Sequence, residues 1–177
     1  MLLKTPQTRF EEIHSIYLES FPKNERRTRD GQKMILENPR YRLRAVEEDG
    51  KILAFLGYWN LDTCVFLEHL ATTGRCRGKG YGKQLVMEVL REAEVPLFLE
   101  IEPVTEKDPM TGRRAEFYKR LGFHLNSFPY FQMPLKPLDS PVPLWIMSYG
   151  GPVTEEEFKP YKEEIYETVY GSFTGQP

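Results

Sequence analysis

The chain has 177 residues, of which 40% are hydrophobic and 28% are charged, and its formal net charge at pH 7 is −2. This composition is that of a globular protein of one ordinary domain, and the near-neutral charge argues against a general nucleic-acid binder. The two cysteines, Cys64 and Cys76, lack metal-ligand spacing and the three histidines are scattered, so neither a disulfide framework nor a metal site is expected.

The amino-terminal stretch 1–6 has no apolar segment long enough for a signal peptide or a membrane span. Together with the sparse cysteines, this predicts a cytoplasmic protein without a membrane partner.

Hydrophobic periodicity predicts helices and strands in alternation along the first half of the chain. Phe10, Ile13 and Tyr17 recur at helical spacing, and Asp49-Gly50 is a strong hairpin signal between two alternating runs. The predicted elements are a helix over 8–20, a short helix around 32–37, strands over 41–48 and 51–60, and a buried strand over 64–72.

The second half begins with the most regular helical pattern, and its last helix carries a capping box formed by Thr154 and Glu157. Gly122 is placed to end a helix as its C′ residue. The predicted elements are a helix over 81–94, a strand over 96–102, a polar loop over 104–111, a helix over 112–121, strands over 123–133 and 143–149, and a final helix after 154.

Between the strand over 64–72 and the helix over 81–94 lies a basic turn with glycine at every second position. Its sequence is Arg77-Gly78-Lys79-Gly80-Tyr81-Gly82-Lys83. Missing Cβ atoms let backbone N–H groups approach a ligand closely, and the first N–H groups of a helix have no intrahelical acceptor. The turn is therefore predicted to bind an anion, most plausibly a diphosphate.

Two common phosphate loops do not fit this turn. A Walker A loop needs Ser or Thr after Gly-Lys, whereas Gln84 follows Gly82-Lys83. A dinucleotide fingerprint needs its third glycine where Lys83 stands. A nucleotide-binding protein is thus the weakest of the readings.

The pattern that does fit is Arg77-x-x-Gly80-x-Gly82 after Leu70-Ala71-Thr72, which resembles the acyl-CoA pyrophosphate loop of the GNAT superfamily of N-acetyltransferases. The segment 68–72 is similar to the strand that precedes that loop, and 117–123 is similar to the end of the last core helix. The element order agrees over roughly residues 8–150.

The resemblance implies an α+β or α/β fold with a central mixed, mostly antiparallel sheet flanked by helices. Residues 1–150 would form the acetyltransferase domain, and 151–177 an additional helical segment packed on it. It also implies acetyl-CoA as co-substrate: Leu70, Ala71 and Thr72 would bind the pantetheine arm, and Arg77, Gly78, Lys79, Gly80, Tyr81, Gly82 and Lys83 the diphosphate.

By the same resemblance Tyr118 is the candidate general acid for the thiolate, although a packed aromatic is the plain alternative. Glu100 and Glu68 are candidate bases, because carboxylates inside apolar strands are costly unless they are paired or open to a cleft. Glu102, two residues after Glu100 on the same strand face, is a third carboxylate of this group. Glu100 is favoured as the base, and a salt bridge to Arg113, Arg114 or Lys107 is the alternative for each. Glu68 is expected on the face of Leu70, with His69 pointing away from both as a packed residue.

Two segments are expected on the acceptor side. The loop 102–111 is longer than in many members of the family, with Thr111 where an asparagine that contacts CoA would stand, and we expect it to shape an acceptor pocket. Residues 25–27 are candidate specificity residues, although a solvated charged loop is the favoured interpretation of them.

The function predicted is acetyl transfer from acetyl-CoA to a primary amine of a small molecule or peptide, by direct attack in a ternary complex, in a monomer or homodimer. The carboxylate-rich strands favour a cationic acceptor. The alternative is a non-catalytic module that binds acyl-CoA for regulation or interaction.

Overall fold

The computed structural model describes residues 3, 6–137 and 139–171. Parts of the two terminal stretches considered above, residues 1–2, 4–5 and 172–177, lie outside the described residues. The helices are α1 (Phe10–Ser20), α2 (Arg29–Ile35), α3 (Tyr81–Glu92), α4 (Pro109–Lys119) and α5 (Glu155–Ile165), and a π-helical turn (Tyr166–Tyr170) continues α5. The strands are β1 (Tyr41–Glu48), β2 (Lys51–Asn60), β3 (Val65–Thr72), β4 (Leu97–Ile101), β5 (Phe123–Leu125), β6 (Tyr130–Gln132) and β7 (Val142–Tyr149).

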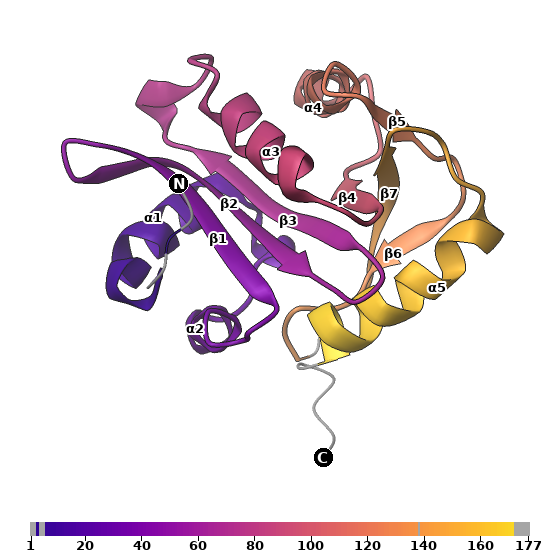
Figure 1. Cartoon of the computed structure of the whole chain (residues 1–177), viewed down its shortest axis with the longest axis horizontal. Coiled ribbons are helices and arrows are strands. Elements are labelled where there is room, and N and C mark those ends of the chain that lie inside the picture. Colours follow the sequence, from indigo (N-terminus) through magenta and orange to yellow (C-terminus); the bar gives the residue numbers. More distant parts are fainter. Residues whose placement is uncertain (1–2, 4–5, 138, 172–177) are drawn as a thin grey trace.

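Within the described residues the strands form one mixed sheet in the order β1-β2-β3-β4-β7-β5, with β6 also paired to β7. Only the β3–β4 pair is parallel, and every other pair is antiparallel. Helices cover both faces of the open sheet (Figure 1). The predicted fold class, a mixed and mostly antiparallel sheet flanked by helices with a further helix at the carboxyl end, is confirmed.

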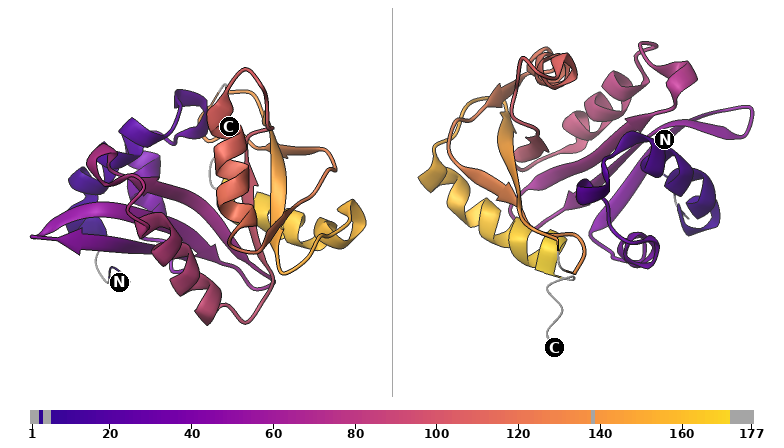
Figure 2. Two further views of the ribbon diagram at one scale, coloured as in Figure 1. Left: turned by 90° about the horizontal axis from the view of Figure 1, so that it is seen from above. Right: turned by 180° about the vertical axis from the view of Figure 1, so that it is seen from behind.

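The sheet separates two hydrophobic cores, one on each face. One face packs against α1, α2 and α5, with Trp59 and Phe66 of the sheet among its buried residues. The other face packs against α3 and α4, with Leu85 and Ala115 among its buried residues. Figure 2 shows α3 on the side of the sheet opposite α1 and α2.

The predicted strand over 123–133 is wrong, because the chain forms two short strands there, β5 and β6. Asn126, between them, is 3% exposed and uses its side chain for long-range bonds. Its Nδ2 donates to the carbonyl of Ile146 at 3.2 Å, and its Oδ1 accepts from the N–H of Val153 at 2.9 Å. These bonds require the backbone to leave the strand at this point.

The predicted loop over 104–111 is also partly helical, since α4 begins at Pro109 rather than at Gly112. Asp108 is the N-cap and accepts from the N–H of Met110 at 2.9 Å, with Pro109 in the first turn. This is the usual arrangement at a helix start, where proline needs no hydrogen-bond partner. In the same way Thr28 caps α2, which therefore begins earlier than predicted.

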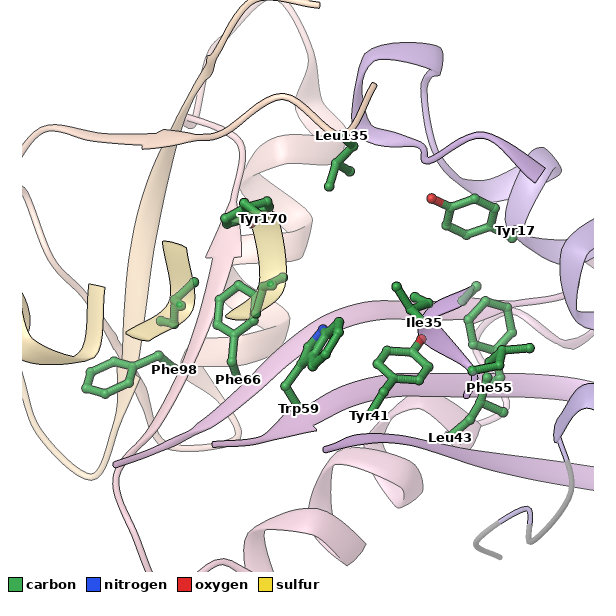
Figure 3. Close-up of a cluster of buried hydrophobic side chains, with 14 of the residues drawn as sticks. Tyr17, Ile35, Tyr41, Leu43, Phe55, Trp59, Phe66, Phe98, Leu135 and Tyr170 are labelled. Carbon is green, nitrogen blue, oxygen red and sulfur yellow. The ribbon is translucent and has the colours of Figure 1, made fainter. Parts of the chain in front are cut away.

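The carboxyl-terminal helix is anchored in the first core. The Thr154–Glu157 capping box is present as predicted, and Phe158 is 1% exposed. The ring centroid of Phe158 lies 5.0 Å from that of Phe98 and 5.4 Å from that of Phe128. Figure 3 shows Phe98, Phe66 and Tyr170 side by side in this core. Among the described residues, no helix combines the length and the apolar character needed to cross a membrane.

Replacing Phe158 by alanine should lower the free energy of unfolding by about 3–5 kcal/mol, because the cavity left among the aromatic rings cannot collapse fully. Phe131→Ala is the matched control: its side chain is 46% exposed, and we expect a loss below about 1 kcal/mol. Urea denaturation of the two variants measures both values. Equal losses of unfolding free energy in Phe158→Ala and Phe131→Ala would show that α5 does not pack against the core through Phe158.

Candidate active site

The site originates where two parallel strands part. β3 pairs with β4 only from Val65↔Leu97 to Leu67↔Leu99, although β3 continues to Thr72. The N–H of Thr73 donates to the carbonyl of Leu53 of the β2 side at 2.9 Å. Because successive N–H groups of a strand alternate in direction, those of Leu70 and Thr72 point away from β2, towards the gap.

A β-bulge marks the same place. Leu67 and His69 pair with two successive residues of β2, so Glu68 is the inserted residue. The bulge interrupts the alternation of faces and corrects two expectations: Glu68 does not share the face of Leu70, and His69 does not point away from Glu68. Glu68 and His69 lie together in the first core, with His69 Nδ1 3.5 Å from Glu68 Oε2, whereas Leu70 packs with the second core.

The glycine-rich turn borders a pocket of about 670 Å³ between β3, α3 and α4. Gly78 and Gly80 have φ of +80° and +86°, a conformation that favours glycine. The first bond within α3 runs from the N–H of Gln84 to the carbonyl of Gly80, so the N–H groups of residues 81–83 precede it and have no intrahelical acceptor. Of the predicted cofactor residues, those that line this pocket are Leu70, Ala71, Thr72, Arg77, Gly78, Gly80, Tyr81, Gly82 and Lys83; the remaining one, Lys79, is not among its lining residues.

A smaller pocket of about 100 Å³ adjoins it, and Ser20, Leu70 and Arg114 line both. Glu68, Glu100 and Tyr118, the three predicted catalytic residues, line this smaller pocket. The gap between β3 and β4 therefore brings together side chains from both faces of the sheet.

Glu68 is held in a buried ion pair. Its Oε1 pairs with Nη1 of Arg27, and both side chains are at most 3% exposed. Trp59 Nε1 donates to its Oε2 at 2.8 Å. Burial opposes ionisation, but the charge of Arg27 and the surrounding donors outweigh it and lower the pKa of Glu68 to about 2. A carboxylate this acidic is a weak base, which favours a structural role.

This pair also corrects the interpretation of residues 25–27 as a solvated loop, because Arg27 is 3% exposed. Its backbone N–H donates to the hydroxyl of Tyr17 at 2.9 Å. Glu25 lines the smaller pocket, and burial together with the charge of Glu102 raises its pKa to about 7.

Glu100 is partly buried and has no cationic partner among the described residues. The hydroxyl of Tyr130 donates to its Oε1, and the hydroxyl of Tyr170 lies 2.7 Å from Oε1 and 2.8 Å from Oε2. Burial raises the pKa of Glu100 to about 7, although the two hydroxyl donors oppose the rise. A carboxyl group with this pKa can take up and release a proton near neutral pH.

Tyr118 keeps its proton at neutral pH, because burial raises its pKa above the ordinary value. Its ring packs against Phe117 and Phe123, with centroids 5.0 and 5.6 Å away. Tyr118 is thus both a packed aromatic residue and a residue that lines the smaller pocket.

Several other polar residues of the region contact neighbouring side chains or backbone. Glu102 pairs with Arg114 at 2.6 Å, one of the salt bridges anticipated for it. Thr111 is buried and ties the loop before α4, accepting from the N–H of Thr105 at 3.1 Å. His69 packs edge-on against aromatic rings as expected. In the described part of the chain, no three His, Cys, Asp or Glu side chains gather to hold a metal ion.

Tyr130 and Tyr170 were not among the predicted site residues, and Arg27 was predicted only as a candidate specificity residue, not as the partner of Glu68. Tyr170 lies off the helical spacing of the buried Phe158, Ile165 and Val169, so periodicity alone does not indicate that it is buried. Nothing near it in the sequence points to Glu100, because the contact joins residues 70 positions apart.

An open sheet parted between two parallel strands, with a glycine-rich turn opening a helix beside the gap, defines the acyl-CoA N-acyltransferase class of fold. The chain belongs to the acetyltransferase (GNAT) family, whose family model matches residues 10–123.

Three individual proteins illustrate the similarity. A Bacillus subtilis (strain 168) protein called "Putative acetyltransferase YjbC" is 32% identical over 129 residues, which cover 70% of this chain and 64%, less than two thirds, of YjbC. The solved structure of a GNAT-family protein from Bacteroides thetaiotaomicron superposes with a TM-score of 0.82 at 28% identity and covers 97% of each chain. The ribosomal-protein-S18-alanine N-acetyltransferase of Escherichia coli shares the fold, with a TM-score of 0.64, 19% identity, and coverage of 88% of this chain and 95% of its own.

Replacing Glu68 by glutamine should lower the free energy of unfolding at pH 7 by about 3–5 kcal/mol, because it leaves the buried charge of Arg27 without its counter-ion. The folded pKa of Glu68, about 2, lies below the ordinary 4.5. Its contribution is therefore complete above pH 4.5 and is lost as the pH falls towards 2. The difference between the two proteins in urea denaturation should narrow over that range.

The double variant Arg27→Met, Glu68→Gln is the control, since it removes both charges and should recover part of the stability. Two results would contradict the ion pair. One is a loss of unfolding free energy in the double variant that exceeds the summed losses of Arg27→Met and Glu68→Gln. The other is a stability difference between wild type and Glu68→Gln that does not change with pH.

Proposed function

We propose that this protein transfers the acetyl group of acetyl-CoA to a primary amine of a small molecule or peptide. The observation that carries the proposal is the meeting of two pockets at Leu70, one bordered by the glycine-rich turn and the other by Glu100 and Tyr118. Direct transfer needs a thioester and an amine held side by side, with a base and an acid in reach.

Acetyl-CoA fits the larger pocket by its chemistry. Its diphosphate suits the N–H groups of residues 81–83 and the cations Arg77 and Lys83. Its pantetheine amides suit the backbone groups of Leu70 and Thr72 that face the gap, in the manner of an added strand. The N–H of Leu70 would polarise the thioester carbonyl and stabilise the developing oxyanion.

Glu100 serves as the base in this proposal. Glu100 accepts one proton from the cationic amine, directly or through a water molecule, and the neutral nitrogen then forms a bond to the thioester carbon. The carbon–sulfur bond breaks, and the second proton that the nitrogen loses restores the hydroxyl of Tyr118 after this hydroxyl has protonated the thiolate. Glu68 is already paired with Arg27. Its role in this proposal is structural: it neutralises the buried charge of Arg27 and fixes the bulge of β3.

Tyr118 completes the proton transfer by donating its hydroxyl proton to the departing thiolate. Burial keeps this hydroxyl protonated before the reaction, and a neutral thiol is a better leaving group than a thiolate in an apolar site.

The acceptor is a compact cationic amine. The smaller pocket holds about 100 Å³ and is lined by the carboxylates Glu25, Glu100 and Glu102, of which only Glu102 has a cationic partner among these three. The name of the Escherichia coli structural neighbour gives an alanine of ribosomal protein S18 as its acceptor, and a small-molecule amine meets the same requirements.

Isothermal titration of acetyl-CoA should show one-to-one binding, and titration of ATP should show none, because the turn lacks the residues of a nucleotide loop. Gly80→Ala should weaken acetyl-CoA binding about tenfold, since alanine at a φ of +86° is strained. Gly74→Ala, where a Cβ meets nothing within 4 Å, is the matched control. Binding of ATP but not acetyl-CoA would refute the proposal, and acetyl-CoA binding without transfer to any amine would indicate the non-catalytic module.

Tyr118→Phe should lower kcat about 100-fold, the ordinary contribution of one proton donor, and leave the affinity for acetyl-CoA unchanged. Thiol release with an active amine measures the rate. Tyr149→Phe is the matched control, since this tyrosine is 45% exposed and is not among the residues lining either pocket. Full activity of Tyr118→Phe would remove Tyr118 from the mechanism.

A further inference from the structure

The end of the described chain reaches the proposed base. After α5 the helix widens into the π-helical turn Tyr166–Tyr170, and the last residue of this turn places its hydroxyl 2.7 and 2.8 Å from the two oxygens of Glu100. Tyr170 is fully buried. Single π-helical turns occur frequently at functional sites.

The turn is fixed to the same buried ion pair that occupies the bulge of β3. Arg27 Nη2 donates to the carbonyl of Val169 at 3.1 Å, and its Nη1 pairs with Glu68. The last carbonyl groups of a helix have no intrahelical partner, so a buried guanidinium is a suitable donor for them. One arginine thus connects the α1–α2 loop, β3 and the carboxyl-terminal turn.

We propose that Tyr170 is a positioning residue for Glu100, and that the carboxyl-terminal turn therefore belongs to the catalytic site. This proposal rests on the proposed function, in which Glu100 accepts the proton of the amine. It concerns a segment outside residues 10–123, the part matched by the family model.

The hydrogen bonds explain how Tyr170 would act. Oε1 of Glu100 accepts from Tyr130 and lies within bonding distance of Tyr170, whereas Tyr170 is the only hydrogen-bond donor to Oε2 among the described residues. The single hydroxyl proton of Tyr170 can occupy one of its two short contacts at a time. Oε2 therefore retains lone pairs that can accept a proton from the amine or from a relaying water.

The same hydroxyl keeps the carboxyl group ionisable. Burial favours neutral Glu100, and the nearby charges of Glu68 and Glu25 act in the same direction. Donation from Tyr130 and Tyr170 stabilises the carboxylate and opposes them. The titratable groups facing Glu100 are Tyr130 of β6, Tyr166 and Tyr170 of the π-helical turn, Glu68 of β3 and Glu25 of the α1–α2 loop.

Tyr170→Phe tests the proposal, because it removes the donor and keeps the ring. Protein labelled with 13C at glutamate carboxyl carbons is titrated by NMR, with the Glu100 signal assigned by its loss in Glu100→Gln. In the wild type Glu100 should titrate near pH 7; in Tyr170→Phe the midpoint should rise by about one unit, because a hydrogen bond to the charged form is lost. In the pH profile of kcat/KM, the apparent pKa of the acidic limb should rise by the same amount.

Tyr166→Phe is the matched control in the same turn, since its hydroxyl donates to the carbonyl of Phe131 at 2.6 Å. It should leave both midpoints unchanged. An unchanged midpoint in Tyr170→Phe, or an equal shift in Tyr166→Phe, would overturn the proposal.

A measurement on the wild type decides the case if Tyr170→Phe does not fold. The 13Cζ chemical shift of Tyr170 should change with pH at the same midpoint as the Glu100 carboxyl signal. A 13Cζ chemical shift that does not change as Glu100 ionises would overturn the proposal. The carboxyl titration needs no substrate. A shifted midpoint in a protein that transfers no acetyl group would therefore refute the proposed function and leave the Tyr170–Glu100 contact standing.

Discussion

The structure depends on the separation of β3 from β4. Two parallel strands that are paired as far as Leu67↔Leu99 part at the bulge of Glu68, and this leaves a strand of the central sheet with unpaired backbone facing a pocket. An unpaired strand edge is normally a liability for a folded protein. Here the gap is bordered by the glycine-rich turn and α4, so the free backbone groups become the place where an extended ligand such as the pantetheine arm can pair.

Two glutamates beside the gap behave in opposite ways. Glu68 and Glu100 lie on neighbouring strands, and within the part of the chain that the structure describes only Glu68 has a cationic partner, Arg27. The cation holds Glu68 ionised, with a pKa of about 2, whereas the tyrosine hydroxyls around Glu100 leave its pKa near 7. Environments that push the pKa values of two carboxyl groups apart separate a structural charge from a proton acceptor.

Much of the fold could be predicted from the sequence, because its signals are local. Periodicity predicted most helices and strands, and the turn 77–83 predicted the opening of α3. What could not be predicted depends on distant partners. The strand over 123–133 is divided by the bonds of Asn126 to β7 and to Val153, and the burial of Arg27 is intelligible only with Glu68, 41 positions later, in place. The contact of Tyr170 with Glu100 likewise appears only once the chain is folded.

The most direct test of this account is residue-resolved amide hydrogen exchange with and without acetyl-CoA. The account predicts that binding slows exchange at Leu70 and Thr72, whose N–H groups face the gap, and at residues 81–83 at the start of α3. The N–H of Thr73, already bonded to Leu53, should change little. Binding that leaves Leu70, Thr72 and the start of α3 unprotected would show that acetyl-CoA lies elsewhere, and the separated strands would then not be its site.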